Sequence, residues 1–89
     1  MSSFLGGSVW AMVQGVAEGH HNITDRSFRS MNRSQLDQLA QEMERQLRDA
    51  RGDQPPIDDM DRVKARNRKI QRLNSARMIM RGFRQRNRI

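Results

Sequence analysis

The side chains of this sequence that could do chemistry are mainly guanidinium and ammonium groups, and they are concentrated near one end. Residues 62–89 hold eleven of the seventeen Lys and Arg residues and no acid, whereas residues 1–61 hold six basic and ten acidic residues. Arginine in particular forms paired hydrogen bonds with phosphate and carboxylate groups. The pattern therefore predicts a surface that binds a polyanion or an acidic partner, formed by Lys64, Arg66, Arg68, Lys69, Arg72, Arg77, Arg81, Arg84, Arg86 and Arg88.

Groups that could catalyse a reaction or hold a metal are sparse. The chain has no Cys, which excludes disulfides, thiolate metal sites and thiol catalysis. His20 and His21 are adjacent, so their rings point in different directions on a regular backbone, and the acids of residues 53–61 lack the spacing of a calcium loop. Ser and Thr are scattered, without a paired His that has an orienting acid. We therefore expect no enzymatic activity, no metal site and no cofactor.

Three segments with helical periodicity must position these side chains, and the first is residues 8–18. Ser8 is suited to be its N-cap and Gly19 to end it. Its apolar stripe includes Val9, Met12, Val13 and Val16, and Trp10 widens it on one side. The segment carries no Lys or Arg, whereas helices that lie on membranes normally do. We therefore favour a packing helix whose glycines let a neighbour approach, and keep a membrane-active segment at residues 4–18 as an alternative.

Residues 33–51 predict a second helix. Asn32 or Ser34 is suited to be its N-cap, and Gly52 to be its C-cap. Its apolar residues fall within about 100° of arc, which is a narrow seam typical of helix–helix contacts. This seam is formed by Leu36, Leu39, Met43 and Leu47, together with Ala40 and Ala50.

Residues 59–84 predict a long third helix after a break at Pro55-Pro56, with Asp58 as N-cap and fraying beyond Gly82. Its apolar residues point in two directions. Val63 and Ile70 lie on one side of the helix. A second apolar set lies about 120° away around the helix axis and consists of Leu73, Ala76, Met80 and Phe83. The basic residues point in nearly every direction, whereas a surface helix of a globule keeps one side free of charge. The pattern predicts a helix that is contacted on more than one side.

These segments predict an all-α protein of three helices, at about residues 8–18, 33–51 and 59–84, in which the last two form a hairpin across the Pro-Pro linker. A single small domain is expected. Residues 1–31 supply the apolar N-terminal helix and a connector, and residues 32–89 supply the hairpin with its basic helix. Only 35% of the 89 residues are hydrophobic and the mean hydropathy is −0.95. Such a chain is not expected to be an independent globule.

The function expected from these features is association. We predict a non-catalytic structural or assembly protein, a subunit of a larger complex such as a virion or ribonucleoprotein particle. It would form a homo- or hetero-oligomer by docking its apolar seams and arginine-rich helix on an acidic protein partner. Sequence-nonspecific nucleic-acid binding by the third helix is the alternative, ahead of membrane activity. Without a recognisable signal peptide, a transmembrane segment or Cys, the expected location is the cytoplasm or the interior of a particle.

Overall fold

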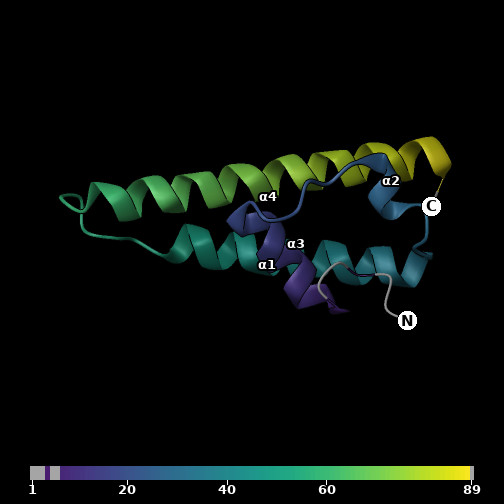
Figure 1. The fold of residues 1–89 in the computed structure, drawn as a ribbon, viewed down its shortest axis with the longest axis horizontal. Coiled ribbons are helices and arrows are strands. Elements are labelled where there is room, and N and C mark those ends of the chain that lie inside the picture. The colour runs from purple at the N-terminus through teal and green to yellow at the C-terminus, as the bar shows by residue number, and fades with distance from the viewer. Residues whose placement is uncertain (1–3, 5–6, 89) are drawn as a thin grey trace.

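The structure, a computed structural model, describes residue 4 and residues 7–88, and the regular structure there is entirely helical. The helices are α1 (Val9–Glu18), α2 (Asp25–Phe28), α3 (Arg33–Gly52) and α4 (Met60–Asn87). As Figure 1 shows, α3 and α4 form an antiparallel hairpin, α1 crosses it near its middle, and α2 lies beside the C-terminal part of α4. The predicted all-α class and the hairpin across the Pro-Pro linker are confirmed.

Local capping places three helix ends where the sequence predicts them. At the start of α1, Ser8 Oγ accepts a hydrogen bond of 3.1 Å from the Ala11 N–H. Gly19 ends α1 with a φ of 84°, a conformation that glycine adopts without strain. Before α3, Asn32 Oδ1 accepts from the Gln35 N–H at 2.8 Å, and Gln35 Oε1 accepts from the Asn32 N–H at 2.9 Å.

The C-terminal end of α4 differs from the prediction of a helix that frays beyond Gly82. The helix continues to Asn87 because tertiary contacts hold its last turns. Phe83 is buried, and its ring centroid lies 5.4 Å from that of Phe28 in α2. Packing at this position outweighs the low helix propensity of one glycine, which costs about 1 kcal/mol.

The two helix ends beside the Pro-Pro linker also differ from the prediction. Gly52, expected as the C-cap of α3, belongs to the helix, and Asp53 follows it as the cap. Asp59, rather than Asp58, caps α4, because its Oδ1 accepts a hydrogen bond of 3.3 Å from the Arg62 N–H. Each difference shifts an end by one residue.

One continuous core joins the helices. The low hydrophobic content of the sequence predicts instead a chain that does not form an independent globule. Its radius of gyration is 13.7 Å, against about 12 Å for a compact chain of this length, and its extents are 44 × 26 × 18 Å. On α4 the first buried residue is Leu73, so the N-terminal turns of this helix extend past the core. The core consists of Met12, Val13, Val16, Ala17, Ile23, Phe28, Met31, Leu36, Leu39, Met43, Leu47, Leu73, Ala76, Met80 and Phe83.

Gly15 is the one glycine within α1, and it lets the connector after the helix approach closely. A Cβ atom on Gly15 would lie 2.1 Å from Cδ2 of the His21 ring. The Gly15 carbonyl oxygen also accepts from the N–H groups of His20 at 2.7 Å and His21 at 3.2 Å. His21 can therefore turn back against α1 only because residue 15 has no side chain.

We predict that Gly15→Ala will not stabilise the protein, although Ala is favoured over Gly in a helix by about 1 kcal/mol. The displaced His21 ring offsets the gain. Gly82→Ala is the matched control, because the nearest atom to its added Cβ is the mobile end of Arg86 at 3.2 Å. The midpoint of thermal unfolding should be higher for Gly82→Ala than for Gly15→Ala. Adding His21→Ala to the Gly15→Ala variant should remove this difference between the midpoints. Equal midpoints for the two glycine variants would contradict the close contact.

Candidate functional site

The apolar residues predicted to form an interface lie mostly inside this chain's own core. Val13, Val16, Leu36, Leu39, Met43, Leu47, Leu73, Met80 and Phe83 are buried. Val9, Val63 and Ile70 are partly buried, and Val9 and Ile70 pack against the core. Trp10 differs from all of these, because 53% of it is exposed. In this fold the buried side chains contact one another and are not available to a partner.

Arg66 of α4 binds the C-terminal end of α3. Its Nε–H lies 2.6 Å from the carbonyl oxygen of Asp53 and 3.0 Å from that of Ala50, and Nη2 donates to the carbonyl oxygen of Arg51 at 3.0 Å. The last carbonyl groups of a helix lack partners within the helix and carry partial negative charge. This arginine therefore caps α3 from the neighbouring helix, and the pair closes the hairpin near the linker.

Arg72 makes a similar contact with α1. Its Nη1 donates to the carbonyl oxygen of Ala17 at 3.3 Å, in the last turn of that helix. The guanidinium group also lies against Gly19, where an added Cβ would be 2.9 Å from Arg72 Cζ. Two of the predicted polyanion-binding residues thus hold other helices of the same chain.

Three further arginines of α4 form ion pairs with acids of α2 and α3. Arg77 pairs with Glu44, Arg86 pairs with Asp25, and Arg84 pairs with Asp37 at 2.8 Å. The sequence separates these acids from the basic helix, but the antiparallel hairpin brings Asp37 and Glu44 beside α4, and the packing of α2 against α4 does the same for Asp25. The hydrogen bond from Arg77 lowers the pKa of Glu44 below its ordinary value, although desolvation acts in the opposite direction.

Six basic side chains of α4 and its C-cap residue have no hydrogen bond or ion pair with another described residue. They are Arg62, Lys64, Arg68, Lys69, Arg81 and Arg88, of which Arg62 is not among the predicted binding residues. The predicted set therefore divides into residues that stabilise the fold and residues whose charge faces solvent. Only the second group can bind an external anion without breaking a contact in the fold.

Two of these cations border an open groove of about 410 Å³ between α3 and α4, which we call the arginine groove. Arg77, Arg81, Arg84 and Arg88 follow one another at intervals of four, three and four residues, so they share one side of the helix. Apolar side chains from both helices contribute to the lining beside these arginines. The lining residues are Ala40, Glu44, Arg77, Met80, Arg81, Arg84, Gln85 and Arg88.

A second groove, of about 420 Å³, lies where α1 meets the linker half of the hairpin, and we call it the tryptophan groove. Its lining includes Trp10 from α1 and the unpaired Arg62 and Lys69 from α4. Basic and acidic side chains are mixed along the remaining lining. Those residues are Gln14, Arg45, Gln46, Asp49, Ala50, Asp53, Ala65 and Arg66.

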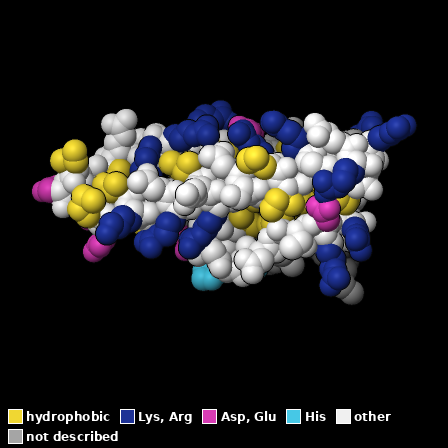
Figure 2. All heavy atoms as spheres, turned by 90° about the horizontal axis from the view of Figure 1, so that it is seen from above, with side chains coloured by type: hydrophobic (Ala, Val, Ile, Leu, Met, Phe, Trp, Pro, Cys, Tyr) yellow, Lys and Arg dark blue, Asp and Glu magenta, His cyan; other side chains and the backbone are white. Residues whose placement is uncertain are grey.

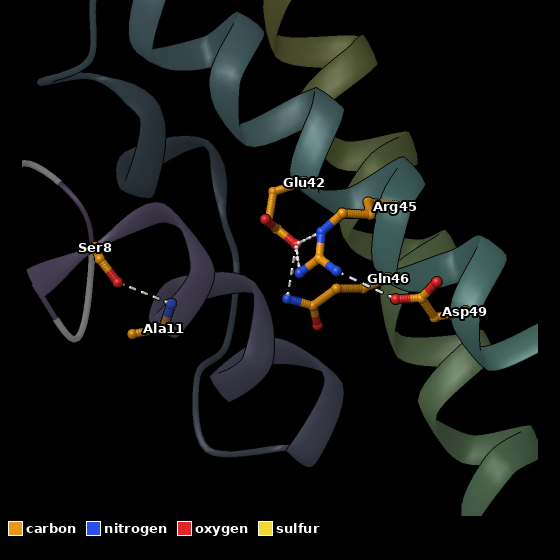
Figure 3. Close-up of polar contacts among 6 residues, drawn as sticks. All are labelled: Ser8, Ala11, Glu42, Arg45, Gln46 and Asp49. Carbon is orange, nitrogen blue, oxygen red and sulfur yellow. Dashed lines mark hydrogen bonds and ion pairs between the residues drawn. The ribbon is translucent and has the colours of Figure 1, made fainter.

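A chain of polar side chains lies along this groove, and Figure 3 shows it on the α3 side. Arg45 is held by Glu42 at 2.6 Å and by Asp49 at 3.2 Å, and Gln46 Nε2 donates to Glu42 Oε2 at 3.1 Å. The hydrogen bond with Glu42 raises the pKa of Arg45 further. The spacing of four residues between Arg45 and Asp49 indicates that pair from the sequence alone, and the spacing of three and four residues from Glu42 is the signal for the remaining bonds. Arg45 thus lies between two carboxylates, and the group keeps a net charge of −1.

Other sites are not indicated among the described residues. Within residues 7–88 no three His, Asp or Glu side chains lie close enough together to hold a metal ion. No helix in that part of the chain has the length and hydropathy to cross a membrane. Comparison of the chain with protein-family models, curated proteins and solved structures finds no match. The function proposed below therefore rests on this chain's own residues.

We predict that Arg66→Lys will destabilise the fold by about 1–3 kcal/mol, because one ammonium group cannot reproduce the several bonds of the guanidinium group to α3. Arg68→Lys is the matched control, since Arg68 has no such partner, and it should change stability by less than about 0.5 kcal/mol. Urea unfolding followed by circular dichroism measures both. Equal effects would mean that Arg66 does not hold α3.

We also predict a small acid-dependent contribution from the pair of Arg77 and Glu44. Because the folded state lowers the pKa of Glu44, the pair stabilises the protein above the ordinary carboxyl pKa of about 4.3, and this gain is lost as the pH falls through the lowered value. Glu44→Gln should therefore reduce stability at neutral pH by less than about 1 kcal/mol and flatten its acid dependence. Asp58→Asn, at an unpaired acid, is the control for urea unfolding at several pH values. A profile unchanged by Glu44→Gln would refute the contribution.

Proposed function

We propose that this protein is a non-catalytic assembly protein that docks an acidic and partly apolar protein surface in its arginine groove. The observation that supports this is the combination within that groove of the apolar, partly exposed Ala40 with Arg81 and Arg88, whose side chains have no hydrogen bond or ion pair with another described residue. The proposed setting is the cytoplasm or a particle such as a virion or a ribonucleoprotein complex.

The composition of the groove favours a protein over a phosphate backbone. A phosphate backbone binds through charge and does not need apolar contacts, whereas a protein surface combines a buried apolar centre with a polar rim. Arg77 and Arg84 already pair with acids of α3. Their positions are therefore fixed, and Arg81 and Arg88 remain to pair with carboxylates of the partner.

Nucleic-acid binding is the second candidate, and the tryptophan groove is the feature that favours it. Proteins that bind single strands combine a basic groove with exposed aromatic side chains on which bases stack. Trp10 is 53% exposed beside the unpaired Arg62 and Lys69. The acids Asp49 and Asp53 in the same lining weaken this candidate, because they repel phosphate.

We predict that Arg81→Glu combined with Arg88→Glu will abolish capture of a protein partner from a nuclease-treated extract of the source cells. The two added carboxylates would repel the acidic surface. Lys64→Glu combined with Arg68→Glu makes the same change in charge outside the groove and should retain capture. Quantitative mass spectrometry of the captured proteins provides the measurement.

Two results would contradict this proposal. If both double variants lose capture equally, the loss reflects the total charge of the protein and not the arginine groove. Capture that disappears on nuclease treatment and requires Trp10 would instead favour the nucleic-acid candidate.

A further inference from the structure

The linker end of the hairpin is an exposed apolar surface surrounded by acids. We call it the hairpin tip, formed by Pro56, Ile57, Asp58, Met60 and Asp61. Ile57 is 90% exposed and Met60 is 53% exposed, although both are large apolar residues. The carboxylates of Asp58 and Asp61 have no hydrogen bond or ion pair with another described residue. Burial of this surface on a partner would remove apolar area from water, worth about 25 cal/mol for each Å².

The hairpin tip is complementary to the arginine groove in both polarity and charge. The tip offers Ile57 and Met60 with unpaired carboxylates beside them. The groove offers the partly exposed Ala40 and, beside it, the guanidinium groups of Arg81 and Arg88, which have no partner among the described residues. Apolar groups can therefore meet apolar groups while each free carboxylate meets a free arginine, which is the arrangement that makes a charged contact specific.

The two surfaces lie at opposite ends of the molecule. Figure 1 shows the linker at one end of the long axis and the C-terminal end of α4 at the other, and the longest extent is 44 Å. Figure 2 shows hydrophobic and acidic side chains together at the left end and mainly basic side chains at the right end. One chain cannot join its own tip to its own groove, so the complementary surfaces can meet only between two molecules.

The charge distribution also selects the partner of the tip. The chain has a net charge of +7, so two copies repel each other unless a negative surface of one faces a positive surface of the other. Four of its ten acids lie in residues 53–61. These acids disfavour a nucleic acid or an anionic membrane at the tip, and they favour a basic protein surface that has an apolar centre.

From this complementarity we propose that the hairpin tip of one copy docks in the arginine groove of the next, so that the protein assembles head to tail with itself. The proposal rests on the proposed function, because it names a second copy of this chain as the occupant of the groove. The contact uses two different surfaces, so an assembly of any length keeps one free tip at one end and one free groove at the other.

The test uses two variants that each lack one of the two surfaces. The groove variant carries Arg81→Glu and Arg88→Glu, and the tip variant carries Ile57→Ser and Asp58→Lys. Asp59, the N-cap of α4, is left unchanged, and circular dichroism verifies that both variants fold. Sedimentation velocity at low salt should show that the wild type grows in mass with concentration, and that each variant alone stays monomeric.

An equimolar mixture of the two variants provides the decisive measurement. The intact tip of the groove variant should bind the intact groove of the tip variant, which gives a two-chain complex that cannot grow further. High salt should dissociate it, since screening shortens the Debye length from about 10 Å at 0.1 M to about 3 Å at 1 M. The control variant carries Lys64→Glu and Arg68→Glu with an intact tip and an intact groove, and it should still assemble.

Three outcomes would overturn the proposal: a monomeric wild type, a tip variant that still assembles, or a mixture that stays monomeric. The proposed function has a separate readout. If the groove variant still loses a captured protein while the wild type is monomeric, the groove binds a different protein and only the self-assembly is refuted. If the groove variant retains its captured proteins as well, both proposals fail.

Discussion

The fold depends on the guanidinium groups of α4, which bind the ends of the other helices from outside the core. Arg66 binds the last carbonyl groups of α3, and Arg72 binds a carbonyl group in the last turn of α1. These contacts satisfy groups that a helix leaves without partners, and they place positive charge at the negative end of each helix dipole. α4 contacts each of the other helices and is therefore the element on which they assemble.

This role changes the meaning of the basic composition. A helix with positive charge on many sides suggests a surface devoted to a partner, yet about half of these charges are used inside the molecule. The remaining unpaired charges fall into separate places, beside the tryptophan groove, beside the arginine groove and on the outer turns that carry Lys64 and Arg68. A partner would thus meet local groups of cations bordered by apolar side chains, rather than one continuous basic face.

The sequence predicts the features that depend on neighbours along the chain. Ser8, Gly19 and Asn32 act through residues within five positions, so their types and spacing are sufficient. The contacts of Arg66 and Arg84 join residues far apart in sequence, and they become visible only when the hairpin sets the register of α4 against α3.

The same limit applies to the apolar residues of α4. The helical wheel shows that Leu73, Met80 and Phe83 share a face, which the structure confirms as the buried face. A wheel does not show whether that face meets another molecule or the same chain. The burial of Phe83 against Phe28 resolves this point and also explains why Gly82 does not end the helix.

The different partners of these arginines have a consequence for how the molecule responds to acid. At the linker half, Arg66 and Arg72 bind peptide carbonyl groups, which do not take up protons between neutral and acid pH. At the other half, Arg77 binds the carboxylate of Glu44, and this hydrogen bond lowers the pKa of Glu44. Acidification should therefore weaken the contact between α3 and α4 at Glu44, while the bonds of Arg66 and Arg72 to carbonyl groups stay unchanged.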